Sequence, residues 1–173
     1  EMITNVIYIA ATSSLLVGTV MNFDSGDISN YFYLVGTCYV QSNKAELAIE
    51  YLKKTIEIDN KHIAALNNLG GAYYEINRTK DSINIYKKLL SLNPNYKSAK
   101  NNLANCYVKL NKYSEAIKIY QDIIIDDPKD YNVYNNLGNM YKDLHKDELA
   151  IEHYNHALEI NKNYFLPTVK WEK

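Results

Sequence analysis

Features that would point to catalysis or nucleic-acid binding are missing from this sequence of 173 residues. There is no glycine-rich phosphate loop, no Cys-x-x-Cys pair and no serine nucleophile elbow. Neither sign of charge dominates, because 19 basic residues face 20 acidic ones and the formal net charge is −1. A chain so balanced has little attraction for the phosphates of nucleic acids. We therefore expect a non-enzymatic protein with no cofactor and no nucleic-acid partner.

Metal-ligating residues are also sparse. His153 and His156 lie at i and i+3, so they share a helix face, with Glu152 or Glu159 nearby. Two histidines do not complete a zinc site, which usually needs three or four protein ligands. We therefore expect no metal site.

A period of 34 residues organises most of the chain. The recurring segments are Leu66-Asn67-Asn68-Leu69-Gly70-x-x-Tyr73, Lys100-Asn101-Asn102-Leu103-Ala104-x-x-Tyr107 and Tyr134-Asn135-Asn136-Leu137-Gly138-x-x-Tyr141. Pro94 and Pro128 have the same spacing, as do Tyr86, Tyr120 and Tyr154. Phe32, Val35, Gly36, Tyr39 and Ala48 mark a fourth, more divergent unit.

This order of an aromatic residue, Leu-Gly, Tyr, Ala, an aromatic residue and Pro resembles the tetratricopeptide repeat (TPR) family. The resemblance implies an all-α fold, a right-handed α-solenoid of antiparallel helix hairpins. We place the repeats at residues 29–62, 63–96, 97–130 and 131–164. One hairpin cannot bury its own apolar face, so we expect stability to come from stacking of neighbouring repeats.

The residues themselves support this fold. Leu66, Leu69 and Tyr73 fall at i, i+3 and i+7, which is the spacing of one helical face. Asn93-Pro94 and Asp127-Pro128 should end helices, since proline disfavours helical geometry in the residue before it. The turn between the two helices of each repeat should contain a residue that tolerates left-handed backbone. The residues at that position are Asn43, Asn77, Asn111 and His145.

Small residues should let the two helices of a hairpin approach each other closely. On the first helix these residues are Gly36, Gly70, Ala104 and Gly138, and their expected partners are Ala48, Ser82, Ala116 and Ala150. Cys38 and Cys106 occupy the same inward phase two repeats apart, too far to form a disulfide. Buried free thiols fit a reducing compartment, and we expect a cytoplasmic protein.

Both ends of the chain depart from the repeat. Residues 2–23 carry no charge, which makes them a candidate membrane span. Their many Thr, Ser and Asn residues, and the lack of Lys or Arg before Lys44, argue against a span. We instead interpret residues 1–28 as a degenerate or partial helical repeat, with its second helix at 9–22. Residues 165–173, with Trp171 near a core phase, would begin a further or capping helix.

Asparagine is concentrated on one face of the predicted first helices. Counting 100° per residue, the positions opposite the core hold ten asparagines among twenty, far above their share of the repeats. An Asn side chain offers two donors and one acceptor, which match the main chain of an extended peptide. The candidate partner-binding residues are Asn67, Asn68, Asn101, Asn102, Asn105, Lys109, Asn132, Asn135, Asn136 and Asn139. Tyr33 and Tyr74 lie outside the core phase and are further candidates.

In TPR proteins this face is the concave groove. The pattern is similar to the asparagine ladder of the TPR superhelix in O-linked N-acetylglucosamine transferases, at Asn68, Asn102 and Asn136, although Leu34 breaks it in the first repeat. The resemblance to chaperone adaptors that clamp a carboxylate is poor, because Lys109 is the only base at these positions.

We therefore expect a scaffold that binds a protein or peptide partner in this groove, with a multi-subunit assembly as one setting. Two alternatives remain. The chain would be the substrate-presenting arm of a larger enzyme such as a glycosyltransferase, or a membrane-anchored adaptor. The asparagines could also be a solvated surface that binds no partner.

Overall fold

The computed structural model describes residues 24–162. Over this range it contains eight α-helices and no strand, which confirms the predicted all-α class. The helices are α2 (Ser25–Gln41), α3 (Ala45–Ile58), α4 (Ile63–Glu75), α5 (Thr79–Leu92), α6 (Lys97–Lys109), α7 (Tyr113–Asp126), α8 (Tyr131–Asp143) and α9 (Asp147–Ile160).

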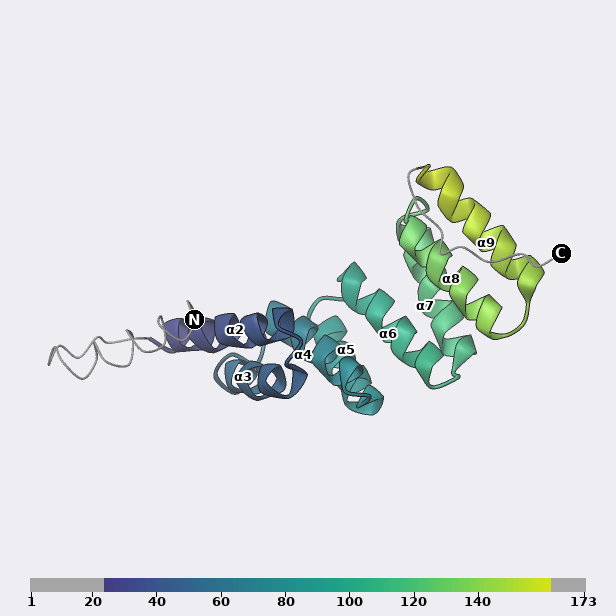
Figure 1. Ribbon diagram of the computed structural model, residues 1–173. Helices are drawn as coiled ribbons and strands as arrows, with labels where there is room; N and C mark the ends of the chain where they lie inside the picture. Colours follow the sequence, from purple (N-terminus) through teal and green to yellow (C-terminus); the bar gives the residue numbers. More distant parts are fainter. Residues whose placement is uncertain (1–23, 163–173) are drawn as a thin grey trace, which may run out of the picture.

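The helices pair in chain order, and the pairs stack into a solenoid. α2 packs on α3, α4 on α5, α6 on α7, and α8 on α9, while each second helix also packs on the first helix of the next pair. Figure 1 shows the pairs following one another along an extended array, from α2 and α3 at one end to α8 and α9 at the other. The first helices α2, α4, α6 and α8 lie side by side and form one face of this array. The predicted solenoid of helix hairpins is therefore confirmed.

Three first helices begin at Ile63, Lys97 and Tyr131, the opening residues of their expected repeats. By contrast, α2 begins at Ser25, four residues before the expected boundary at 29. Asp24 accounts for the earlier start, because its Oδ1 accepts a hydrogen bond from the backbone N–H of Asp27 at 2.9 Å. This is the N-cap arrangement that satisfies the free N–H groups of a first turn.

The turns inside the hairpins have the backbone that the sequence predicts. Asn43, Asn77, Asn111 and His145 have positive φ angles of 55°, 62°, 58° and 55°. In the second repeat Asn77 N–H donates to the carbonyl of Tyr74, and Arg78 N–H donates to that of Tyr73. The same pair of bonds recurs in the other three turns. It is the Schellman motif, which satisfies the last carbonyls of a helix and needs one left-handed residue.

Buried side chains join each repeat to the next. One cluster contains Leu52 from α3 and Leu69 from α4, a second contains Leu89 from α5 and Leu103 from α6, and a third contains Ile123 from α7 and Leu137 from α8. α5 and α7 end at Leu92 and Asp126, directly before the Asn-Pro and Asp-Pro pairs. Because apolar burial spans the boundaries, the stability of each repeat depends on its neighbour.

Within a hairpin, the small residue of the first helix lies against a large side chain of the second. A Cβ atom added to Gly70 would lie 2.6 Å from Cζ of Tyr86, and one added to Gly138 would lie 2.5 Å from Cε1 of Tyr154. The expected small partners are buried, and Ser82 Oγ donates a 2.7 Å hydrogen bond to the carbonyl of Gly70. The close approach was thus predicted, but its main contact is the ring one helical turn further along.

Cys38 and Cys106 are both free. Cys106 is buried beside Ser82, with Oγ and Sγ 3.2 Å apart, and burial raises the pKa of its thiol. Three predicted segments lie outside the described residues: the helix at 9–22, the candidate membrane span at 2–23 and the further or capping helix at 165–173. Among residues 24–162, no helix is long and apolar enough to span a membrane.

Gly70→Ala should lower the free energy of unfolding by about 1 to 3 kcal/mol, because the added methyl group overlaps the buried ring of Tyr86. Gly71→Ala is the matched control in the same helix. Its Cβ would lie 3.7 Å from the Tyr86 hydroxyl, an ordinary contact. Since alanine favours helix over glycine, Gly71→Ala should stabilise by about 0.5 to 1 kcal/mol. Urea unfolding followed by circular dichroism measures both; equal effects of the two substitutions would contradict the close-packing account.

Candidate functional site

Two adjoining cavities lie on the face formed by the first helices. The first, about 320 Å³, is lined by Lys97, Ser98, Asn101, Asn105, Asp130, Asn132 and Asn136. The second, about 490 Å³, is lined by Tyr74, Asn105, Val108, Lys109, Asn111, Tyr113, Tyr120, Asn136, Asn139, Met140 and Asp143. They share Asn105 and Asn136, so together they form one groove between α6 and α8 that reaches α4. We call this surface the amide groove.

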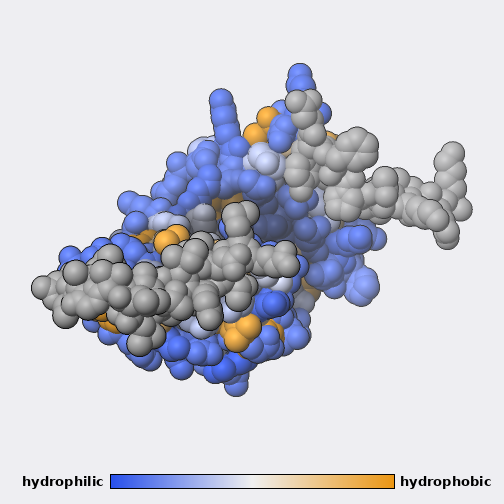
Figure 2. Space-filling model, turned by 60° about the vertical axis from the view of Figure 1, so that its left-hand side comes forward, coloured by the Kyte–Doolittle hydropathy of each residue, from blue (hydrophilic) through white to orange (hydrophobic). Residues whose placement is uncertain are grey.

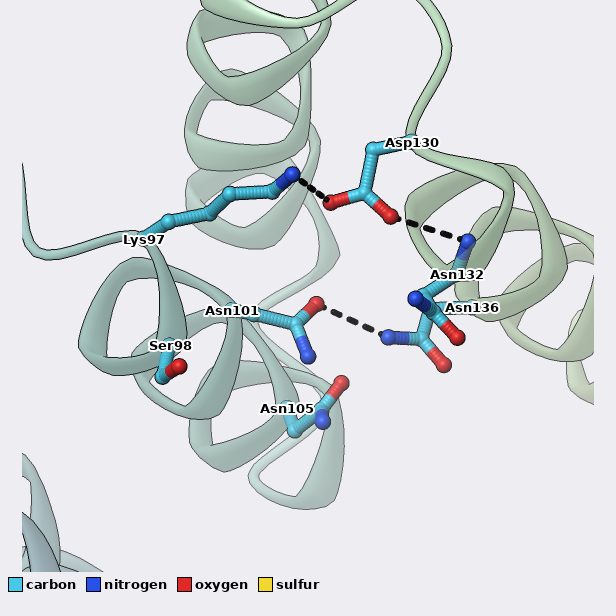
Figure 3. A pocket seen from close by; sticks show the side chains of 7 residues that line it. All are labelled: Lys97, Ser98, Asn101, Asn105, Asp130, Asn132 and Asn136. Atoms are coloured by element: carbon cyan, nitrogen blue, oxygen red, sulfur yellow. Dashed lines mark hydrogen bonds and ion pairs between the residues drawn. The ribbon is translucent and has the colours of Figure 1, made fainter.

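Amide and ionic hydrogen bonds connect the two walls of the first cavity. Figure 3 shows the side chains of α6 on one side facing those of α8 and its N-terminal loop on the other. Nδ2 of Asn136 donates to Oδ1 of Asn101 at 2.8 Å, and Nζ of Lys97 lies 2.8 Å from Oδ2 of Asp130. The Asn136–Asn101 bond links the third repeat to the fourth across the groove, and the Lys97–Asp130 ion pair links the start of α6 to the loop before α8.

Asp130 has two roles at this junction. Its Oδ1 accepts a hydrogen bond from the backbone N–H of Asn132 at 3.0 Å and so caps α8, while its Oδ2 pairs with Lys97. The Asp130 side chain is 7% exposed, so its charge is compensated inside the protein. Lys97 also pairs with the exposed Asp127 at 2.6 Å. The hydrogen bonds to Asp127 and then Asp130 raise the pKa of Lys97, and Lys97 in turn lowers the pKa of Asp127.

The second cavity has an aromatic and cationic end at α4. Lys109 Nζ lies 4.2 Å from the centroid of the Tyr74 ring and donates a 3.1 Å hydrogen bond to the Tyr74 carbonyl. A cation over an aromatic face is attracted by the ring quadrupole. Tyr74 thus lies in the groove, whereas Tyr33, the other tyrosine outside the core phase, packs on the His62 ring at 4.7 Å between centroids.

The ten candidate residues fall into two groups. Those that line the amide groove are Asn101, Asn105, Lys109, Asn132, Asn136 and Asn139. Those that line neither cavity are Asn67, Asn68, Asn102 and Asn135. In the second group, Asn68 Nδ2 donates to Thr37 Oγ1 at 3.3 Å, and Asn102 interacts with the Tyr86 hydroxyl.

Asn68, Asn102 and Asn136 occupy the same position of three repeats, and each contacts the preceding repeat. These amides therefore connect neighbouring repeats. Oδ1 of Asn67 and of Asn135 is buried without a hydrogen-bond partner in the described part of the chain. The equivalent atom in the third repeat is Oδ1 of Asn101, which accepts from Asn136.

The groove is also lined by residues that the sequence pattern did not predict to bind a partner: Lys97, Asp130, Tyr113 and Tyr120. Asp130 precedes a first helix, and Tyr120 has the phase of a core residue. A spacing of 15 residues from Asn105 to Tyr120 and from Asn139 to Tyr154 is the pattern that could have found the tyrosines.

The histidines of α9 belong to an aromatic stack outside the amide groove. The His153 ring stacks on Tyr141 at 5.2 Å and 5° between planes, and the His156 ring stacks on Tyr134 at 5.4 Å. Burial lowers the pKa of His153. Among residues 24–162 no group of three or more His, Cys, Asp or Glu side chains is placed to hold a metal ion.

The visible face in Figure 2 is mostly hydrophilic, with isolated hydrophobic residues. Leu34, at the repeat position of the bridging asparagines, is 61% exposed, and Ile125 near the end of α7 is 77% exposed. Single exposed apolar residues are normal on a protein surface. The polar amide groove is the surface feature that needs a functional explanation.

The stacked hairpins, left-handed turns and buried Gly-Tyr contacts define an α-solenoid built from 34-residue helical repeats. Two tetratricopeptide repeat family models match residues 77–139 and 131–164, and a model of the anaphase-promoting complex, cyclosome, subunit 3 matches residues 10–89. The chain belongs to the tetratricopeptide repeat family. No curated protein matches it.

Solved structures show the same fold. A crystal structure of MamA is 24% identical with a TM-score of 0.71, covering 89% of this chain and 86% of MamA. MamA from Desulfovibrio magneticus RS-1, from residue 41 to its end, is 21% identical with a TM-score of 0.71, covering 80% of this chain and 78% of the other. The APC/C hetero-tetramer Cut9-Hcn1 contains a chain that is 24% identical with a TM-score of 0.68, covering 78% of this chain but 27% of that one.

Asp130→Ala should lower the free energy of unfolding by about 1 to 2 kcal/mol, because α8 loses its N-cap. Asp127→Ala is the matched control. It also removes a carboxylate from Lys97, but one that is exposed and solvent-screened, so its loss should be smaller. Thermal unfolding at low and moderate salt compares the two. An Asp127→Ala effect as large as that of Asp130→Ala would show that the cap does not stabilise this junction.

Proposed function

We propose that this chain is a protein-interaction scaffold that holds a partner polypeptide in the amide groove. The observation that carries the proposal is the pair of adjoining polar cavities between α6 and α8, lined by six of the ten residues chosen from the sequence. The fold supports the general role, because stacked helical repeats present extended surfaces to partners. Cut9, whose assembly contains a structurally similar chain, supplies an example within a hetero-tetramer with Hcn1.

The chemistry of the groove favours polypeptide over a compact ligand. Asparagine is the most frequent residue type in its lining, which is mainly polar, whereas small-molecule sites are mostly apolar concavities. An Asn side chain has the same donor and acceptor groups as a peptide bond, so a row of them fits an extended main chain. The bound segment would cross the third and fourth repeats and reach Tyr74 and Lys109 at its α4 end.

The four remaining candidates would act from behind this surface. Asn68 and Asn102 contact the preceding repeat, so they would set the angle between repeats and with it the width of the groove. Asn67 and Asn135 would pack beneath it. Replacing these residues would change stability and binding together, which makes them poor probes of contact with a partner.

Asn132→Trp is a sharper probe. Asn132 is exposed, its side chain points into the first cavity, and the hydrogen bond that holds it uses its backbone N–H. The indole should fill the cavity and weaken partner binding by about tenfold or more, which corresponds to about 1.4 kcal/mol, without lowering the thermal midpoint. The matched control is Asn155→Trp, the same change at an exposed residue of α9.

The experiment isolates peptides from a phage-displayed library of random dodecapeptides on the full chain, and measures their affinity for the three proteins by calorimetry. Peptides that bind the wild type and Asn155→Trp equally, but Asn132→Trp weakly, would support the proposal. If no selected peptide discriminates between the two variants, the amide groove is not the binding surface.

A further inference from the structure

Two tyrosine-asparagine pairs repeat at the 34-residue period across the amide groove. The Tyr154 hydroxyl donates a 2.7 Å hydrogen bond to Oδ1 of Asn139, and the Tyr120 hydroxyl donates to Oδ1 of Asn105. In the second repeat Gly71 takes the place of the asparagine, and Tyr86 interacts with Asn102 instead. Within residues 24–162, the pairing therefore occurs in the third and fourth repeats, where the groove lies.

Tyr120 lines the second cavity, whereas Tyr154 lines neither cavity and contacts Asn139, which does. The Tyr154 ring packs against α8 at Gly138, where a Cβ would lie 2.5 Å from the ring, and Tyr120 belongs to the same buried cluster as Ala104 of α6. Tyr120 is 0% exposed, and burial raises the pKa of its hydroxyl, which stays protonated at neutral pH. A buried tyrosine hydroxyl that donates a hydrogen bond to an asparagine oxygen is held in one position.

The pairing decides which half of each amide faces outward. An asparagine side chain has one carbonyl oxygen and one NH₂ group with two donors. In Asn105 and Asn139 the side-chain oxygen accepts a hydrogen bond from a tyrosine hydroxyl. In Asn101 it accepts a hydrogen bond from the side chain of Asn136. Among the described residues, Nδ2 of these three asparagines makes no hydrogen bond, so their donors remain for a ligand.

The charges beside these donors favour a neutral acceptor. Lys97 is paired with Asp127 and Asp130, and Lys109 is held against Tyr74. Asp130 and Asp143 place carboxylates at the two cavities. A carboxylate or phosphate ligand would be repelled by these negative charges, and both lysines of the groove already have partners within the protein. Main-chain carbonyl oxygens are neutral acceptors and occur along any extended polypeptide.

We propose that Tyr120 and Tyr154 are positioning residues that make the amide groove a hydrogen-bond donor, so that a bound polypeptide is held through its main-chain carbonyl oxygens by Nδ2 of Asn101, Asn105 and Asn139. This rests on the proposed function and specifies it. Because every residue type has the same main-chain carbonyl, such a groove selects extended conformation more than side-chain sequence.

Asn139→Asp tests the direction of the hydrogen bond. The aspartate can still accept from Tyr154, but it replaces the NH₂ donor by an oxygen that repels a carbonyl group. The probe is a dodecapeptide that was selected on the full chain and that binds Asn132→Trp more weakly than the wild type. Asn139→Asp should weaken the binding of this peptide by about tenfold, as expected for the loss of one hydrogen bond and the added repulsion. Asn155→Asp, which adds the same charge on α9, should leave the affinity unchanged.

The positioning role has its own readout. Tyr120→Phe removes the hydroxyl that orients Asn105 and should weaken the same peptide by about threefold, less than the loss of a donor. Replacing single peptide amides by esters, whose carbonyls are weaker acceptors, should weaken binding to the wild type at the contacting bonds. The loss of affinity caused by an ester should be smaller with Tyr120→Phe than with the wild type. A purely structural role of the hydroxyl would leave this loss unchanged.

The outcomes separate the two proposals. Binding that Asn139→Asp leaves unchanged or tightens would overturn the donor assignment while keeping the groove as the binding site. Esters that bind as well as amides would do the same. Selected peptides that are insensitive to Asn132→Trp would overturn the groove itself, and the donor assignment with it.

Discussion

The approach of a small residue on the first helix of a hairpin to a large side chain on the second is the contact on which the rest of this protein depends; that side chain is Leu52 in the first repeat and a tyrosine in the second and fourth. At Gly70 and Gly138 there is no room for a methyl group between the helix backbone and the ring. In these two repeats the helices approach this closely because the position has no side chain, and a closed hairpin presents a surface that its neighbour covers. In the third repeat Ala104 fills the same position and Tyr120 is still fully buried.

The same contact links the core to the groove. A tyrosine that packs under the first helix ends on the far side of that helix, where its hydroxyl meets the amides of the outer face. Core packing and surface chemistry are therefore coupled through one side chain in the third and fourth repeats. The second repeat has the ring but lacks the asparagine, since Gly71 stands in its place, and it contributes Tyr74 and not an amide to the cavities.

The junction of the third and fourth repeats combines this coupling with charge. Asp130 caps α8 from the end of the preceding linker and pairs with Lys97 at the start of α6. The groove is thus lined by the Lys97–Asp130 ion pair in its first cavity and by Lys109 over Tyr74 in its second. The asparagines of the groove lie between two lysines that are already engaged, so in the proposed function hydrogen bonding would be the main means of recognition.

Much of the fold could be predicted because its rules are local. The left-handed turns at Asn43, Asn77, Asn111 and His145, and the helix ends before Pro94 and Pro128, follow from the backbone preferences of those residues. The start of α2 could not be placed by the repeat alone, because the cap at Asp24 extends this helix beyond the period. Helical rotation of about 100° per residue also predicted an outward phase for the asparagines. Asn67 and Asn135 differ from this expectation, because their Oδ1 atoms are buried.

The sequence by itself determined the repeat and the all-α class, because each depends on spacing along one chain. Tertiary structure decided which of these amides line a cavity and which connect repeats, since Asn136 meets Asn101 only where α6 and α8 pack side by side. It also decided the orientation of each amide. At Asn105 and Asn139 that orientation is set by tyrosine hydroxyl groups from the second helix of the hairpin, which folding brings within hydrogen-bond distance.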